Sequence, residues 1–90
     1  EIKDGHRLSL QYHNEKDETI YVLKGTLTLL HSSGVRESLT TQLLQEGEAF
    51  RVHPMTIHRF AACHGDVTLL EVSTDYPKDV VRLEDDYRRD

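Results

Sequence analysis

An all-β fold of short antiparallel strands, a barrel or a sandwich, is predicted by three features of the sequence. Segments rich in β-branched and aromatic residues recur at short intervals, and Gly, Pro and Ser turns separate them. No segment before residue 77 has the period of an amphipathic helix. The chain has 90 residues, without repeats or linkers, so we expect one domain spanning residues 1–90.

The expected strands span residues 7–13, 19–24, 26–31, 38–44, 49–53, 57–62 and 67–73. The first one alternates, and side chains two apart share a face of a strand. We therefore expect Arg7, Ser9, Gln11 and His13 to face the barrel lumen, and Leu8, Leu10 and Tyr12 to face the other side. Ile20, Val22 and Phe60 should line the rest of the lumen.

The C-terminal tail, residues 78–90, carries a few apolar side chains among many charges. These are Val80, Val81, Leu83 and Tyr87. The pattern is compatible with a short helix or with an irregular strap that covers part of the barrel.

Charge and composition exclude several classes of partner. A net charge of −5 does not favour nucleic-acid binding, and no apolar run approaches the length of roughly 18 residues that spans a bilayer. Cys63 is the only cysteine, so no internal disulfide can form, which fits a reducing cytoplasm. No targeting segment is visible, but the sequence begins at Glu1 without a methionine, so the natural N-terminus can lie upstream.

Polar side chains on the first strand suggest a metal centre. Gln11 and His13 share a face, and Glu18 follows after a gap long enough for one tight turn, so the three can converge from neighbouring strands. His58, on a later strand, can supply a fourth donor. Taken singly, such a histidine is more often a surface or core residue. Nitrogen and oxygen donors of this kind suit one divalent ion such as zinc, manganese, iron, cobalt or nickel.

The spacing of these four residues resembles the two motifs of the cupin superfamily. Residues 5–25 read G-x5-Q-x-H-x4-E-x6-G, which differs from the first cupin motif by glutamine in place of its first histidine. Residues 47–58 keep the glycine and the histidine of the second motif. His53, Met55 and Ala62 replace its proline, glycine and asparagine.

This resemblance implies a double-stranded β-helix (cupin or jelly-roll) barrel, mainly antiparallel, with a short C-terminal tail. Gly25 and Gly47 would lie at sharp turns. It also implies that Gln11, His13, Glu18 and His58 bind the ion.

Glutamine at position 11 is similar to the ligand set of phosphomannose isomerases, and the chain resembles small phosphomannose-isomerase-like cupins (cupin type-2 domains). The resemblance implies a sugar or sugar-phosphate ligand and an isomerase or epimerase activity. Gln11 is a neutral donor, so Glu18 is the only anionic ligand, and the centre keeps a net charge near +1 that suits a Lewis acid.

An isomerase also requires a base, and no motif identifies one. The candidates for catalytic residues are His53, Arg59 and Glu71, with Lys24 as a further option. The remaining histidines, His6, His31 and His64, lie at expected strand ends or turns, where a solvated surface position is the expectation.

Three other interpretations stay open. The chain could be a non-catalytic module that binds a small sugar-like ligand, an iron- or manganese-dependent oxygenase, or a barrel whose metal centre is vestigial. Enzymatic function is favoured but not decided. A homodimer is expected, because pairing of edge strands would cover exposed backbone groups.

Overall fold

The computed structural model describes residues 1–32 and 38–86. Its strands are β1 (Leu10–Tyr12), β2 (Glu18–Lys24), β3 (Leu27–Ser32), β4 (Thr40–Leu44), β5 (Ala49–Val52), β6 (Ile57–Ala61), β7 (Thr68–Ser73) and β8 (Val81–Glu84).

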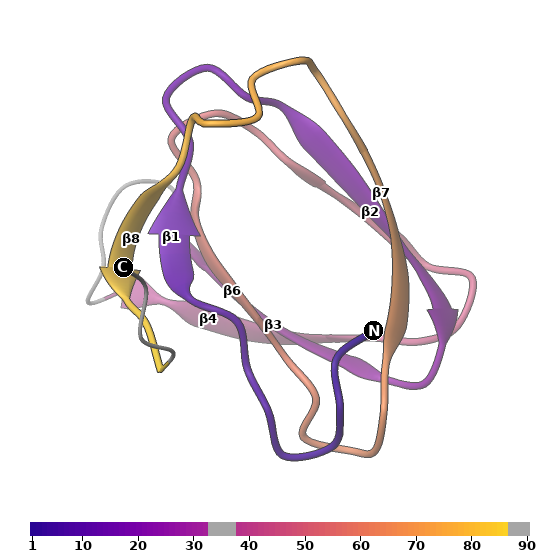
Figure 1. The fold of residues 1–90 in the computed structure, drawn as a ribbon. Coiled ribbons are helices and arrows are strands. Elements are labelled where there is room, and N and C mark those ends of the chain that lie inside the picture. The colour runs from indigo at the N-terminus through magenta and orange to yellow at the C-terminus, as the bar shows by residue number, and fades with distance from the viewer. Residues whose placement is uncertain (33–37, 87–90) are drawn as a thin grey trace.

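The strands form two sheets that face each other across the interior (Figure 1). One sheet has the order β4-β3-β6-β1-β8 and the other the order β5-β2-β7, and every pairing in them is antiparallel. No α-helix occurs in the described residues, so the expected all-β jelly-roll is confirmed. In the same residues, nothing forms a helix with the length and apolar character that a bilayer span requires.

The main departure from the expected strands lies at the two ends of the chain. β1 keeps only three residues of the expected first strand. Part of the tail forms β8, a regular strand that pairs with β1, where we expected a helix or an irregular strap. Tyr87 and the rest of residues 87–90 lie outside the described residues. Figure 1 shows β8 beside β1 at the margin of the larger sheet.

An irregularity in the pairing of the first segment with β6 changes which side chains face inward. The paired residues advance by four from Arg7 to Gln11 but by three from Ala61 to His58. The extra residue reverses, once, which of the alternating side chains face inward, as a β-bulge does. The lumenal placement expected for Arg7 was therefore wrong, and its guanidinium binds exposed Asp86. Leu8 packs against the core, also contrary to expectation.

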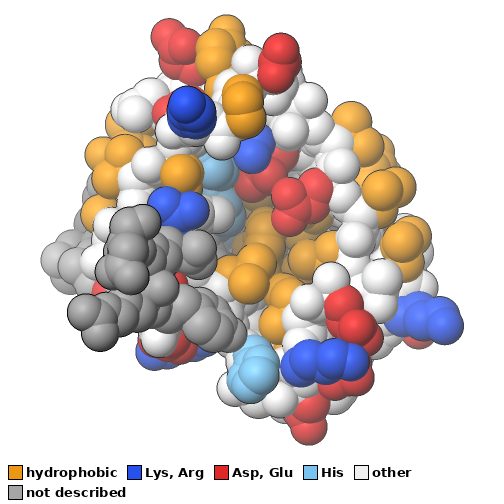
Figure 2. Space-filling model, viewed as in Figure 1, with side chains coloured by type: hydrophobic (Ala, Val, Ile, Leu, Met, Phe, Trp, Pro, Cys, Tyr) orange, Lys and Arg blue, Asp and Glu red, His pale blue; other side chains and the backbone are white. Residues whose placement is uncertain are grey.

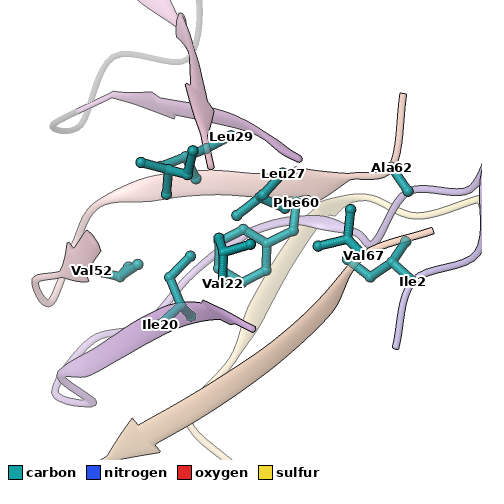
Figure 3. Packing of buried hydrophobic residues seen from close by; sticks show 10 residues of the cluster. Ile2, Ile20, Val22, Leu27, Leu29, Val52, Phe60, Ala62 and Val67 are labelled. Carbon is teal, nitrogen blue, oxygen red and sulfur yellow. The ribbon is translucent and has the colours of Figure 1, made fainter. Parts of the chain in front are cut away.

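Apolar side chains from both sheets fill one end of the interior. The buried cluster consists of Ile2, Ile20, Val22, Leu27, Leu29, Leu44, Val52, Phe60, Ala62 and Val67. Figure 3 shows the Phe60 ring close to Val22 and Leu27, with Ile2 and Val67 together farther along. Burial of each large side chain contributes about 1.5–3 kcal/mol. The lumenal positions expected for Ile20, Val22 and Phe60 agree with this cluster.

Two glycines permit sharp turns, one at the end of the first motif segment and one at the start of the second. Gly25 and Gly47 have φ values of 85° and 86°, in the left-handed region that favours glycine. They differ in their surroundings. A Cβ on Gly25 would lie 2.2 Å from the carbonyl oxygen of Asp66, whereas a Cβ on Gly47 would meet nothing within 4 Å.

Alanine at these two positions should therefore have unequal effects. Gly25→Ala should lower the free energy of unfolding by about 3 kcal/mol or more, because overpacking against backbone adds to the left-handed strain. Gly47→Ala, the matched control, should cost about 1 kcal/mol from the strain alone. Urea unfolding of both variants measures the difference, and equal losses would contradict this account.

Candidate metal centre

Three buried side chains with metal-binding groups converge inside the barrel. His13 follows β1, Glu18 begins β2 and His58 lies in β6. Their side chains are 3%, 3% and 0% exposed. One potential ligand atom from each lies within 4.8 Å of the others. Figure 2 shows a hollow on this face of the molecule, with histidine and acidic side chains on its upper wall and hydrophobic side chains on its floor.

Backbone carbonyls hold both imidazoles in one orientation. His13 Nδ1 lies 2.5 Å from the carbonyl oxygen of Asp79, and His58 Nδ1 lies 2.9 Å from that of Thr56. A carbonyl only accepts hydrogen bonds, so each Nδ1 carries the proton and donates. In the neutral ring, the lone pair is then on Nε2, and both Nε2 atoms are buried without a hydrogen-bond partner.

The spacing of the donor atoms fits a metal ion. Glu18 Oε1 lies 3.4 Å from His13 Nε2 and 3.3 Å from His58 Nε2. Two ligands that are each about 2.1 Å from an ion, with a tetrahedral angle between them, lie about 3.4 Å apart. A carboxylate and two neutral Nε2 lone pairs offer one another no hydrogen. The cluster is therefore suited to sharing a cation.

Glu18 is buried, yet its environment favours the carboxylate. Burial alone would raise the pKa of Glu18. When the imidazoles are protonated, His58 can donate to Glu18, and the positive charges of His58, His13 and Lys16 outweigh burial and hold the pKa below its ordinary value. Lys16 Nζ lies 3.9 Å from Glu18 Oε2. An anionic oxygen is thus available beside the two imidazole nitrogens.

Gln11 lies next to this cluster, on the neighbouring strand. It is directly opposite His58 in the β1–β6 pairing, and paired residues share a face. The Ser9 hydroxyl donates to Gln11 Oε1 across 3.1 Å, and a carbonyl oxygen has a second lone pair. His13, Glu18 and His58 form the possible metal site, and ligation by Gln11 stays a prediction.

Among the candidate bases, Glu71 faces the lumen. It lies opposite Ile20 in the β2–β7 pairing, and Ile20 is fully buried in the core. The Glu71 side chain is exposed to solvent, and partial desolvation together with the negative charge of Glu18 raises the pKa of its carboxyl. A carboxylate with a raised pKa, outside the ligand set, is suited to accepting a proton.

The other candidate catalytic residues point away from the cluster or lie at strand ends. Arg59 alternates with His58 on β6, so it points to the outer face, where its guanidinium binds the carbonyl of Leu8 and the backbone and side chain of Glu84. His53 and Lys24 are exposed at strand ends. These placements disfavour catalytic roles for Arg59, His53 and Lys24.

One lumenal histidine was missed by the sequence analysis. His31 is directly opposite His58 in the β3–β6 pairing, and its ring lies 4.8 Å from that of Phe50. The expectation of a solvated surface position was therefore wrong for His31, whereas His6 and His64 are exposed. The sequence pattern did indicate an inward position, because His31 continues the alternation in which Leu27 and Leu29 face inward.

The segment after β7 holds the loop that joins His13 to Glu18. The backbone amides of Asn14, Glu15 and Lys16 donate to the Asp79 carboxylate at 2.6–3.0 Å. The next amide, that of Asp17, donates to the Thr74 hydroxyl at 3.0 Å. The three backbone donors lower the pKa of Asp79 to about 2. No sequence motif indicated this role for Asp79.

Met55 takes the position of the glycine in the second motif and keeps a glycine-like conformation. Its φ is 69°, and it is the only described non-glycine residue with a positive φ. Its amide donates to the carbonyl oxygen of His13 across 2.6 Å. The turn before His58 is therefore tied to the His13 backbone in spite of the strain.

Met55→Gly should stabilise the fold by about 0.5–1 kcal/mol. It removes a left-handed strain of about 1–2 kcal/mol, offset in part by the entropy of glycine in the unfolded chain. The Met55 side chain is 53% exposed, so little packing is lost. The control is Thr56→Gly at a residue without a positive φ, which should destabilise. Thermal and urea unfolding measure both, and a destabilised Met55→Gly would refute the strain.

Comparison with known proteins agrees with this geometry. The family model described as a cupin domain matches residues 1–73. The chain belongs to the cupin family. Cupins commonly bind a metal ion, which agrees with the possible His13, Glu18 and His58 site, although the identity of the metal is unresolved. No curated protein matches the chain significantly.

Solved structures resemble this cupin in fold at low sequence identity. A 3,4-ketoisomerase, QdtA from Thermoanaerobacterium thermosaccharolyticum in complex with TDP, has a TM-score of 0.76 and 13% identity, over 91% of this chain and 60% of that one. The capsular polysaccharide assembling protein CapF from Staphylococcus aureus has a TM-score of 0.79 and 16% identity, over 91% of this chain and 26% of that one. KdgF from Halomonas sp. has a TM-score of 0.66 and 21% identity, over 79% of this chain and 59% of that one. This chain thus spans less than two thirds of each of them.

Proposed function

We propose that this chain is a metal-dependent isomerase or epimerase of sugars or sugar phosphates. One observation carries the proposal: a carboxylate with a raised pKa, Glu71, shares the lumen with the cluster of His13, Glu18 and His58 but is not part of it. Gln11, beside His58, is proposed as the fourth ligand.

The solved neighbours support carbohydrate carbonyl chemistry in general. Two of the three described above are a sugar 3,4-ketoisomerase and a protein of capsular polysaccharide assembly. At 13% and 16% identity, the likeness extends to the fold alone. A sugar ligand is therefore a proposal for this chain. They do not single out phosphomannose isomerase, and we therefore leave the sugar unspecified.

The proposed chemistry divides between the ion and the protein. A divalent ion held by Gln11, His13, Glu18 and His58 would supply a Lewis acid for a sugar carbonyl or hydroxyl oxygen. The Glu71 carboxylate would accept the proton from the hydroxyl-bearing carbon next to the carbonyl and return it to the former carbonyl carbon, while the hydroxyl proton passes to the former carbonyl oxygen. The hydrophobic floor of the hollow (Figure 2) would contact the C–H face of the sugar and exclude water.

Metal content tests the ligand assignment. His13→Ala and His58→Ala should each abolish binding of the ion, because each removes one of two nitrogen donors. Gln11→His should retain the ion, since it restores the more common cupin ligand, but it should impair turnover. Mass spectrometry of the purified variants gives the metal-to-protein ratio.

The matched controls are His6→Ala and His64→Ala, which remove exposed histidines and should leave the metal content unchanged. Full occupancy in His13→Ala and His58→Ala would leave the assignment without support.

Glu71→Gln should separate catalysis from metal binding. It should lower kcat by about 10²–10⁴-fold, as expected for loss of a general base, with the metal content unchanged. A general base must be ionised, so wild-type turnover should increase with pH as Glu71 loses its proton, and the variant should lack this limb. Isomerisation of a panel of hexose and pentose phosphates is the assay. Unchanged kcat in the variant would exclude Glu71 as the base.

The same assay distinguishes the remaining interpretations. Metal binding without turnover of any sugar in the panel would favour a non-catalytic ligand-binding module or an iron- or manganese-dependent oxygenase, and no metal binding would favour a vestigial centre.

We also propose a homodimer and a cytoplasmic location. The dimer is supported by exposed Tyr21, Leu23, Leu70 and Val72 on β2 and β7. The location is supported by a free, exposed Cys63.

A further inference from the structure

The loop between His13 and Glu18 is bound through its backbone by the segment after β7. Four consecutive amides, those of residues 14 to 17, donate to only two side chains, Asp79 and Thr74. Asp79 receives the first three and also accepts a side-chain hydrogen bond from Asn14 at 3.4 Å. Hydrogen bonds to a charged group are stronger than those between neutral groups.

Other forces on this loop are weak. It has the sequence Asn-Glu-Lys-Asp and contains no apolar side chain that burial could anchor. Asn14 and Glu15 are exposed. Its side-chain ion pairs run from Lys16 to Glu18 and from Asp17 to Arg51, and the cationic partner of each is partly solvated. The conformation of the loop therefore depends mainly on its backbone hydrogen bonds to Asp79 and Thr74.

A second contact extends from Asp79 to a proposed metal ligand. The Asp79 carbonyl oxygen accepts from His13 Nδ1 across 2.5 Å, which directs His13 Nε2 toward Glu18 Oε1. The carboxylate of Asp79 holds the loop and its carbonyl holds the ring. One residue thus sets both the separation of His13 from Glu18 and the orientation of His13.

We propose that Asp79 is a positioning residue of the metal centre, which fixes the His13–Glu18 loop with its carboxylate and the His13 ring with its backbone carbonyl. This inference rests on the proposed metal centre, but not on isomerase activity. Asp79 lies beyond residues 1–73, the part that matches the cupin family model, so it adds an element from outside the matched domain. Groups that orient a metal ligand typically change metal affinity by 10–100-fold when they are removed.

The test compares the wild-type chain with Asp79→Ala, Asp79→Asn and a control. Co²⁺ is titrated into each metal-free protein, with a competing chelator, and visible absorption reports binding. Asp79→Ala should weaken Co²⁺ binding 10–100-fold. Asp79→Asn should have an intermediate effect, because its amide has one acceptor oxygen for three donors.

The control is Asp86→Asn. Asp86 lies in the same C-terminal segment and forms a bidentate ion pair with Arg7, but has no contact with the loop in the described residues. Its Co²⁺ affinity should stay within about threefold of wild type. Thermal unfolding of all metal-free variants shows whether the fold is retained.

A readout without metal separates positioning from general stability. ¹⁵N NMR of metal-free protein should show a single Nδ1–H tautomer for both His13 and His58 in wild type. The two Asp79 variants keep the backbone carbonyl but lose the carboxylate contacts that align it with the loop, so His13 should become a mixture of tautomers. His58, held by Thr56, should stay unchanged. Loss of both signals would indicate global unfolding and would overturn the assignment to Asp79.

The outcomes distinguish this proposal from the proposed function. Wild-type Co²⁺ affinity and an unchanged His13 tautomer in Asp79→Ala would overturn the positioning role alone. A wild-type chain that binds no Co²⁺ would overturn the metal centre, and this proposal with it. Failure to isomerise any sugar, with Co²⁺ binding intact and dependent on Asp79, would overturn only the proposed function.

Discussion

Antiparallel pairing of β1 with β6 is the constraint on which the candidate centre depends. It sets Gln11 opposite His58, two residues that belong to different motifs and lie far apart in the sequence. The next strand along, β3, extends this row to His31. A shift of the pairing by one residue would turn His58 to the outer face, where Arg59 now lies. The one-residue irregularity before Gln11 is what reconciles an outward Arg7 with an inward Gln11.

The interior carries costs that a core of apolar side chains would avoid. The Nε2 atoms of His13 and His58 are buried without hydrogen-bond partners, each at a cost of about 1–3 kcal/mol. Met55 adds left-handed strain in the turn that precedes His58. Such destabilising features are typically found at functional sites, where the side chains are arranged for function at the expense of stability. In this chain they surround the same three side chains that can share a cation.

Much of the fold could be predicted from the sequence, because alternation and turn residues report strands directly. The glycine turns and the convergence of His13, Glu18 and His58 followed from spacing. The positions of Arg7 and Leu8 could not be predicted, since a bulge depends on the partner strand. The role of Asp79 could not be predicted for a different reason. Its role consists of hydrogen bonds to backbone amides, and backbone partners leave no trace in residue identity.

The contribution of β8 and Asp79 also has a consequence for the order of events during synthesis. Both strand neighbours of β1, which are β6 and β8, come from later in the chain, and β8 is the last of the described strands. Contacts between such distant segments form slowly, because a long loop must close before they add stability. On the ribosome, residues 13 to 18 would emerge well before the carboxylate that orders their loop. An ion captured before Asp79 emerges would meet an unformed centre, so metal loading should follow the emergence of Asp79 and β8.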